Sequence, residues 1–219
     1  LLAFTMTAVL RAGVLAAPAA PAYSSPKEAV KKVPNWDLVG EYGARDGKAA
    51  LQATLLKDGD FLVARYAEGL PGNGWNGSKI DSFTSDAKQL RALLRDYKRI
   101  ERRSPTLGAP APENALISFP NGLTNIENGL LRAGGKTTVP LGSFRLHVEF
   151  MLPIKPTRNP SNQDRANSGI YIFNNDEVQV IDSFGLDLYA KNNAIEVESG
   201  ANRWCGALYK TKTPDINMA

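Results

Sequence analysis

Two short strand-type runs near the C-terminal end constrain the fold of this chain more than any other feature. The first lies within Arg165–Phe173 (RANSGIYIF) and the second within Glu177–Gly185 (EVQVIDSFG). Side chains of a β-strand point alternately to the two faces of a sheet, so one face can be apolar while the other carries function. The polar side chains on and beside these two runs are Arg165, Asn167, Glu177, Gln179 and Asp182. Carboxylates and amides gathered in this way are typical of a site that binds a polyhydroxylated ligand.

The chain from Ser104 onward predicts an antiparallel β-sandwich. Residues 144–150 (FRLHVEF) alternate strictly between apolar and polar side chains. Further short runs at 115–119, 130–132 and 137–139 are bounded by Gly, Asn or Pro, and strands at this spacing are typical of a sandwich. We expect the apolar side chains of the alternating run to be buried together: Phe144, Leu146, Val148 and Phe150. The other face of that run carries Arg145, His147 and Glu149.

A smaller unit is expected before Ser104. Leu51–Leu56 and Phe61–Tyr66 flank Asp58-Gly59, a dipeptide suited to a tight turn, and together they predict a β-hairpin. Residues 70–77 form a loop rich in Gly and Asn. Beyond it, apolar residues recur at helical spacing and predict a helix over residues 85–103, capped by Ser85, with a solvated basic face.

The N-terminal segment predicts export. Residues 1–22 are apolar and small and end in an Ala- and Pro-rich stretch with a small-residue cleavage pattern, so we interpret them as part of a signal peptide followed by a linker over 23–34. The alternative is an ordinary buried helix, but prolines crowd its end. Arg11 interrupts the apolar run, which argues against a membrane span of about 20 residues. No stable membrane insertion is expected after cleavage.

Composition narrows the possible functions. The formal net charge is +4, and the basic residues concentrate between Lys88 and Arg103. Neither aromatic interleaving nor zinc-type spacing accompanies them, so no nucleic-acid partner is expected. With one Cys and one His, the chain has neither an internal disulfide nor a Cys/His zinc site. Cys205 is interpreted as a small packed thiol rather than as half of a protease dyad with His147.

Together with Cys205–Lys210 (CGALYK) and Phe144–Phe150, the two C-terminal runs resemble the 3-keto-disaccharide hydrolase family. The loop Leu70–Trp75 and the linker Ser104–Gly108 are also similar to that family. The resemblance covers about residues 35–219 and is strongest from Ser104.

The resemblance implies an all-β chain with a concanavalin-like jelly-roll sandwich over 104–219, preceded by a small β-rich module over 35–103. Family members continue with further strands, so the sandwich is expected to be incomplete at the C-terminus. The resemblance also implies a periplasmic or extracellular bacterial protein, and it favours strands rather than a helix over 85–103.

The implied activity is hydrolysis of the glycosidic bond in 3-keto-disaccharides or 3-keto-glycosides. The ketone at carbon 3 acidifies the hydrogen at carbon 2, so one base can start an elimination that water addition completes. Glu177 is the candidate base, Arg165 or Asn167 the donor to the enolate, Gln179 the group that orients the ring, and His147 or Glu149 the group that assists the leaving oxygen. The predicted catalytic residues are Glu177, Glu149, His147 and Asp182. The predicted carbohydrate-binding residues are Arg165, Asn167, Ser168, Gln179, Tyr209 and Trp204.

Three other functions stay open. Laminarinase-type enzymes of the same fold place three acids at alternate positions of one strand, which here are Glu177, Gln179 and Ile181, so a second acid such as Glu149 would be needed. The sandwich also suits a non-catalytic carbohydrate-binding module, because fold alone does not fix function. A surface protein that binds through the basic segment is the remaining possibility.

Several candidate site residues also have structural interpretations. Asn167-Ser168 could form only a turn and a strand start, Asp182-Ser183 could only cap a loop, and Trp204 or Tyr209 could belong to the core. The cofactor is unknown. A divalent ion on Asp182, Glu177 and Asn167 is chemically reasonable, but no loop spacing fixes such a site.

Overall fold

The computed structural model describes residues 21–78, 80–156, 163–173, 175–185 and 200–216. Within these residues every strand pairs antiparallel and only two short α-helices occur, so the predicted all-β, sandwich-like class is confirmed. The predicted leader lies outside the described residues except for Pro21 and Ala22. The predicted linker at 23–34 contains a helix, α1 (Pro26–Lys32), whose first turn is capped by the Ser25 hydroxyl.

A five-stranded sheet dominates the first half of the chain, and its strands follow the order β4-β3-β2-β1-β5. All five fall within the predicted module at 35–103, although its status as a separate domain stays a prediction. The strands are β1 (Gly40–Ala44), β2 (Ala50–Leu55), β3 (Phe61–Tyr66), β4 (Asp81–Ser85) and β5 (Tyr97–Ile100).

The predicted hairpin forms the centre of this sheet. β2 and β3 pair from Ala50 opposite Tyr66 to Leu55 opposite Phe61. The turn between them contains Gly59 at φ 95°, a left-handed conformation that glycine adopts without steric cost. Nearly all side chains of both strands are buried, because each face of the sheet is covered.

The helix predicted over 85–103 is shorter than expected. α2 spans Ala87–Leu93, and Asp86 caps it by accepting a hydrogen bond from the Gln89 amide at 2.7 Å. A 3-10 turn over Leu94–Asp96 follows, and the chain then enters β5. The prediction of a helix to residue 103 was wrong beyond Leu93, because pairing of β5 with β1 satisfies more backbone groups than a frayed helix end does.

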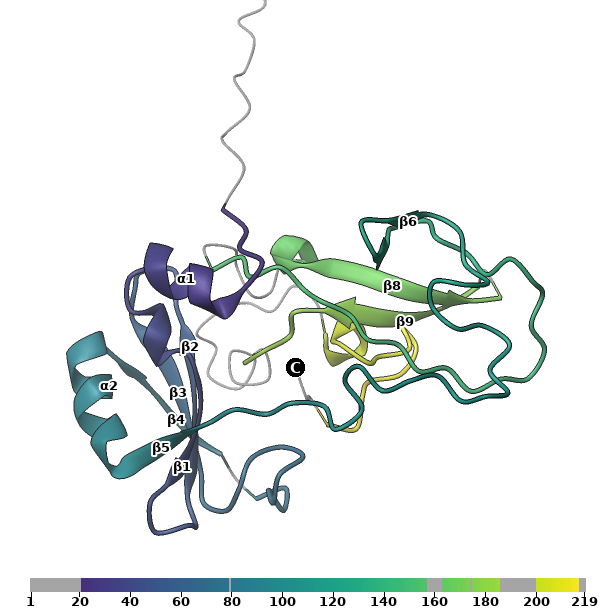
Figure 1. Ribbon diagram of the computed structural model, residues 1–219. Coiled ribbons are helices and arrows are strands. Elements are labelled where there is room, and N and C mark those ends of the chain that lie inside the picture. The colour runs from purple at the N-terminus through teal and green to yellow at the C-terminus, as the bar shows by residue number, and fades with distance from the viewer. Residues whose placement is uncertain (1–20, 79, 157–162, 174, 186–199, 217–219) are drawn as a thin grey trace, which may run out of the picture.

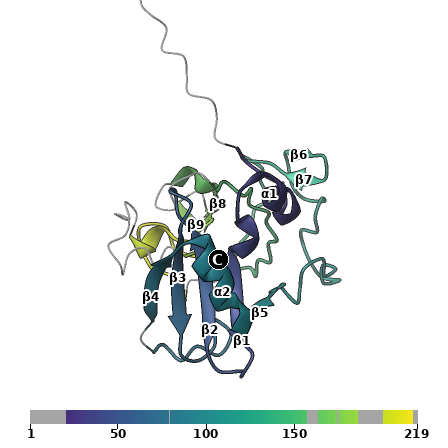
Figure 2. The same cartoon turned by 90° about the vertical axis from the view of Figure 1, so that its left-hand side faces the viewer.

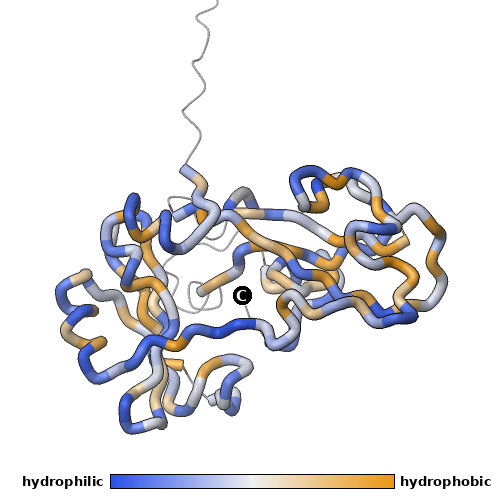
Figure 3. Tube along the Cα trace, in the orientation of Figure 1, coloured by the Kyte–Doolittle hydropathy of each residue, from blue (hydrophilic) through white to orange (hydrophobic). Residues whose placement is uncertain are grey.

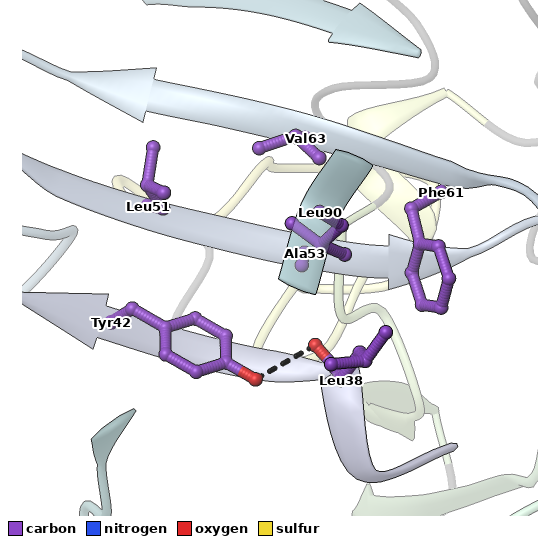
Figure 4. Close-up of a cluster of buried hydrophobic side chains, with 7 residues drawn as sticks. All are labelled: Leu38, Tyr42, Leu51, Ala53, Phe61, Val63 and Leu90. Carbon is purple, nitrogen blue, oxygen red and sulfur yellow. Dashed lines mark hydrogen bonds between the residues drawn. The ribbon is translucent and has the colours of Figure 1, made fainter. Parts of the chain in front are cut away.

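One face of the sheet packs against α2 and the 3-10 turn Trp36–Leu38, as Figures 1 and 2 show. Figure 4 shows the cluster between them, in which the Tyr42 hydroxyl donates to the Leu38 carbonyl at 2.9 Å. The cluster consists of Leu38, Tyr42, Leu51, Ala53, Phe61, Val63 and Leu90.

The opposite face packs against the C-terminal part of the chain. A second buried cluster, which includes Leu62, Tyr66 and Leu70, has Trp204 packed against it. Gly185 lies so close to β2 that a Cβ there would come within 2.4 Å of the Thr54 hydroxyl. The five-stranded sheet is therefore held between α2 and the segments that follow β9.

Three arginines of the basic segment make contacts inside the chain. Arg91 forms a two-pronged ion pair with Asp37, at 2.7 and 3.1 Å. Arg99 donates to the carbonyls of Asp37 and Val39, and Arg102 pairs with the nearly buried Glu41. These contacts tie α2, β5 and the continuation of β5 to residues 37–41, which precede and begin β1, and they support a structural use of the basic segment.

The second half of the chain has less regular structure than predicted. It contains two two-stranded sheets, and between β7 and β8 the chain is largely in loops, where Figure 3 shows apolar stretches. Of the short runs at 115–119, 130–132 and 137–139, only the second contributes a strand. The four strands are β6 (Ile126–Glu127), β7 (Leu130–Leu131), β8 (Asn167–Ile172) and β9 (Asp176–Ile181).

The predicted strand at 144–150 does not form. No ladder pairs this segment, and its four apolar side chains are between 38% and 55% exposed: Phe144, Leu146, Val148 and Phe150. The expectation that they are buried together was therefore wrong. An alternating sequence forms a strand only where a neighbouring edge bonds to its backbone, and here none does.

In the part of the chain that the structure describes, no helix is both long and apolar enough to span a membrane.

Candidate functional site

The hairpin β8–β9 carries most of the predicted site residues. Its strands pair with Asn167 opposite Ile181, Gly169 opposite Gln179 and Tyr171 opposite Glu177. Residues opposite each other share a face, so the register sorts the side chains of the hairpin. The first face, called here the polar face, carries Asn167, Gly169, Tyr171, Glu177, Gln179 and Ile181. The second carries Ser168, Ile170, Ile172, Asp176, Val178 and Val180.

Residues 206–209 extend the hairpin on the free side of β9. The Tyr209 amide donates to the Glu177 carbonyl at 2.8 Å, and the Gln179 amide donates to the Ala207 carbonyl at 2.9 Å. Val178 bridges Leu208, so Tyr209 lies beside Glu177 on the polar face. Glu177 thus has a tyrosine on each side, Tyr171 from β8 and Tyr209 from the C-terminal segment.

The Glu177 carboxylate lies over Gly169. A Cβ at position 169 would come within 2.0 Å of Glu177 Oε1, so the absence of a side chain there makes room for the carboxylate. Tyr171 hydrogen-bonds to Glu177, and this bond, followed by the negative charge of Glu177, raises the pKa of the Tyr171 hydroxyl. Among the described residues no lysine or arginine forms an ion pair with Glu177. The Glu177 carboxylate therefore has no cationic partner in the part of the chain that the structure describes.

Gln179 is the most deeply buried polar side chain of this face, at 1% exposure. Neither its amide nitrogen nor its amide oxygen has a hydrogen-bond partner among the described residues. Leaving a buried amide unpaired costs about 1–3 kcal/mol, so such groups usually have a partner in the working protein. Next to Glu177, an unpaired amide is suited to bind a hydroxyl or carbonyl of a ligand.

Tyr209 is held in place by Gln163, whose side-chain amide donates to the tyrosine hydroxyl at 3.0 Å. The Tyr209 ring also lies near two cations, 5.1 Å from Lys210 Nζ and 6.0 Å from the Arg203 guanidinium carbon. Tyr171, Gly169 and Gln163 were missed as site residues by the sequence analysis. The first two follow Asn167 at alternate positions in a predicted strand, so strand periodicity contained that signal.

Arg165 and Asp182 pair at the open end of the hairpin. Arg165 Nε donates to Asp182 Oδ2 at 2.9 Å, and Asp182 Oδ1 accepts from the Phe184 amide at 3.2 Å. Arg165 is only 8% exposed. The buried Ser183 hydroxyl accepts from the Cys205 amide at 3.3 Å. These contacts match the loop-capping interpretation of Asp182-Ser183, and they occupy groups that a ligand would otherwise use.

Three further predicted residues lie away from Glu177. His147 Nε2 is 3.4 Å from Glu149 Oε1, and Glu149 also accepts from the Gly108 amide at 2.6 Å. No described contact joins either residue to the hairpin. Trp204 packs against the five-stranded sheet, as its interpretation as a core residue predicts.

Two other predictions bear on the polar face. Ser168 lies on the face opposite Glu177, whereas Asn167 shares the Glu177 face. Among the described residues there is no group of three or more His, Cys, Asp or Glu side chains arranged to hold a metal ion.

Comparison of the chain with protein-family models, with curated proteins and with solved structures gives no match.

Proposed function

We propose that this protein is an exported hydrolase that cleaves the glycosidic bond of 3-keto-disaccharides or related 3-keto-glycosides. The observation that carries the proposal is a single uncompensated carboxylate, Glu177, next to an unpaired buried amide, Gln179, on a face flanked by two tyrosines. Elimination from a keto sugar needs one general base and nearby hydrogen-bond donors, and this face supplies both.

The proposed reaction begins when Glu177 takes the proton from carbon 2. The electron pair of that bond forms an enolate with the carbon-3 ketone. As the enolate collapses back to the ketone, a double bond forms between carbons 1 and 2 and the glycosidic oxygen leaves with its electron pair. Water then adds its hydroxyl group at carbon 1 and its remaining proton goes to the departed oxygen, while the proton held by Glu177 returns to carbon 2. The net change is hydrolysis, with no oxidation or reduction.

Hydrolysis of an unoxidised glycan is less well supported by this face. That reaction uses two carboxylic groups on either side of the scissile bond. Glu177 is the one carboxylate on the polar face of the hairpin, since Asp176 lies on the other face and Asp182 is paired with Arg165. The ketone removes the need for a second carboxylate.

The direct test is to incubate the purified protein with a 3-keto-disaccharide and, in parallel, with its unoxidised parent. We expect release of the free sugars from the keto substrate and none from the parent. Cleavage of the parent at a similar rate would contradict the proposal and favour a laminarinase-like reaction.

Binding of carbohydrate without catalysis is the second candidate function. It is favoured by the exposed ring of Tyr171, at 63% exposure, and by Tyr209 on the other side of Glu177, because aromatic rings bind the apolar faces of sugars. Saturable binding of both sugars without release of product would support this function over the first.

Replacement of Gly169 by alanine tests whether the position of the Glu177 carboxylate matters. The new methyl group would displace the carboxylate, a flexible side-chain end, so we expect little loss of stability but a fall in turnover of about a hundredfold. The matched control is Gly142→Ala, because a Cβ at Gly142 meets no atom within 4 Å. Equal turnover by the two variants would contradict the assigned position. Melting temperatures of both variants check the fold.

A further inference from the structure

The proposed reaction needs a proton donor as well as a base, because the glycosidic oxygen leaves as an anion unless it receives a proton. The residues predicted for this step, His147 and Glu149, contact each other and the Gly108 amide, and no described contact joins them to the hairpin. Asp182 is paired with Arg165 at 2.9 Å. The remaining side chains of the polar face are therefore the candidates for the donor.

Two tyrosines flank Glu177 on this face, and their hydroxyl groups are held differently. The Tyr209 hydroxyl accepts from the Gln163 side-chain amide at 3.0 Å and lies 3.4 Å from Gln163 Oε1, so Gln163 occupies both its lone pair and its proton. The Tyr171 side chain is exposed, and its hydroxyl bonds to Glu177 itself. Tyr171 is thus the tyrosine whose hydroxyl a ligand on this face can reach.

The strand register brings Tyr171 and Glu177 as close together as a β-sheet allows. Tyr171 lies directly opposite Glu177, whose carbonyl accepts from the Tyr209 amide and therefore points away from β8. Such a non-hydrogen-bonded antiparallel pair has its Cα atoms only about 4.5 Å apart, and both side chains project from the same face. A carboxylate and a phenol are thus held side by side on one surface.

The neighbouring carboxylate controls when the phenol can release its proton. The hydrogen bond to Glu177, followed by its negative charge, raises the pKa of the Tyr171 hydroxyl above the ordinary value of 10.0. The hydroxyl is therefore protonated at neutral pH, as a general acid must be. When Glu177 takes up a proton its negative charge disappears, and Tyr171 then releases its own proton more readily.

We propose that Tyr171 protonates the departing glycosidic oxygen, and that the site accordingly takes 3-keto-glycosides whose carbon-2 hydrogen and glycosidic oxygen lie on the same face of the sugar ring. Glu177 and Tyr171 project from one surface, so both reach a bound ring from the same side. In a glucose-configured ring, a β-linked oxygen lies on the same face as the carbon-2 hydrogen, whereas an α-linked oxygen lies on the opposite face. This role of Tyr171 rests on the proposed function and narrows it to one class of substrate.

The protons balance over one reaction cycle. Glu177 takes the proton from carbon 2, and Tyr171 gives its proton to the glycosidic oxygen as the bond between that oxygen and carbon 1 breaks. Water then adds its hydroxyl group at carbon 1, and its remaining proton restores Tyr171. The proton held by Glu177 returns to carbon 2. Both side chains end in their starting state, and the net change is hydrolysis without oxidation or reduction.

A matched pair of substrates tests the stereochemistry with the unmodified protein. The two probes are cellobiose and maltose that carry the ketone at carbon 3 of the nonreducing ring, and they differ only in the configuration of the linkage. We expect glucose to be released from keto-cellobiose at least about a hundredfold faster than from keto-maltose, because only the β-linked oxygen faces Tyr171. Similar rates, or faster release from keto-maltose, would overturn the inference and leave the proposed function standing. Release from neither sugar would overturn both.

Tyr171→Phe tests the proton donor, since it removes the hydroxyl group and keeps the exposed ring. Cleavage of keto-cellobiose should slow about a hundredfold, whereas a keto-glucoside of nitrophenol, whose oxygen leaves without protonation, should lose less than about tenfold. The matched control is Tyr97→Phe, the same change in β5 and outside the hairpin, which should leave both rates unaltered. Equal losses on the two substrates would rule out a donor role for Tyr171.

Titration of the tyrosines by ultraviolet absorbance tests the contact without any turnover. Glu177→Gln removes the negative charge beside Tyr171, so it should lower the pKa of one tyrosine, and this change should vanish when Tyr171→Phe is also present. A titration curve that Glu177→Gln leaves unchanged would show that the two side chains do not meet. The inference would then be wrong even in a protein that cleaves keto sugars.

Discussion

Glu177→Gln is expected to abolish most turnover of a 3-keto-disaccharide while leaving the fold and sugar binding intact. The substitution keeps the shape of the side chain but removes the group that accepts the carbon-2 proton. Loss of a general base typically slows a reaction by about a hundred- to ten-thousandfold. The measurement is the rate of product release at saturating substrate, together with the affinity of the variant for the keto sugar.

Glu113→Gln is the matched control, since it makes the same chemical change at an exposed position far along the chain from the hairpin. A substrate deuterated at carbon 2 should also react more slowly with the unmodified protein if proton transfer limits the rate. Near-normal turnover by Glu177→Gln would contradict its role and transfer the base function to His147, Glu149 or Asp182. Absence of any isotope effect or exchange at carbon 2 would favour direct displacement instead of elimination.

The sequence predicts the secondary structure of this protein best where neighbouring segments of the chain determine it. The β2–β3 hairpin follows from two apolar runs and the Asp58-Gly59 turn, and it forms at the expected residues. The strands β8 and β9 likewise form in the two stretches first recognised, with β9 beginning one residue earlier, because a short turn lets neighbouring strands pair. In both cases the backbone partner is the next segment of the chain.

Prediction fails where a distant segment supplies or withholds the backbone partner. Residues 97–100 have helical periodicity, but they pair with the edge of β1 and form the strand β5. Residues 144–150 have clear strand periodicity, yet no edge pairs with them in the structure. In each case side-chain pattern is a weaker constraint than the satisfaction of backbone hydrogen bonds by tertiary contacts.

In the candidate site, too, the features set by local strand structure could be predicted and those set by long-range packing could not. Glu177 and Gln179 share a face because strand alternation alone requires it. The structural contacts of Arg165 and Asp182, and of Trp204, depend on long-range packing that spacing does not reveal. Gly169 is informative only once the register is known, since its significance is the Glu177 carboxylate that lies across it.

Leu51→Ala is expected to lower the free energy of unfolding by about 2–5 kcal/mol, the range for removing a fully buried leucine. Leu51 has no exposed surface and packs in the cluster between the sheet and α2 (Figure 4). Because domains are typically stable by only about 5–15 kcal/mol, this loss should shift the denaturation midpoint strongly. The matched control is Leu116→Ala, at 83% exposure, for which a change within about 0.5 kcal/mol is expected.

The same experiment tests whether the C-terminal segment unfolds with the five-stranded sheet. Leu51 points toward α2, whereas Trp204 packs against the other face of the sheet, and Gly185 lies against Thr54 on that same face. If these contacts couple the two parts, tryptophan fluorescence and far-ultraviolet circular dichroism should report one midpoint, and Leu51→Ala should lower it in both signals. Two separate midpoints, of which only one moves in the variant, would show that the hairpin and its site are stabilised independently of the sheet. A midpoint equal to that of Leu116→Ala would instead contradict the burial of Leu51.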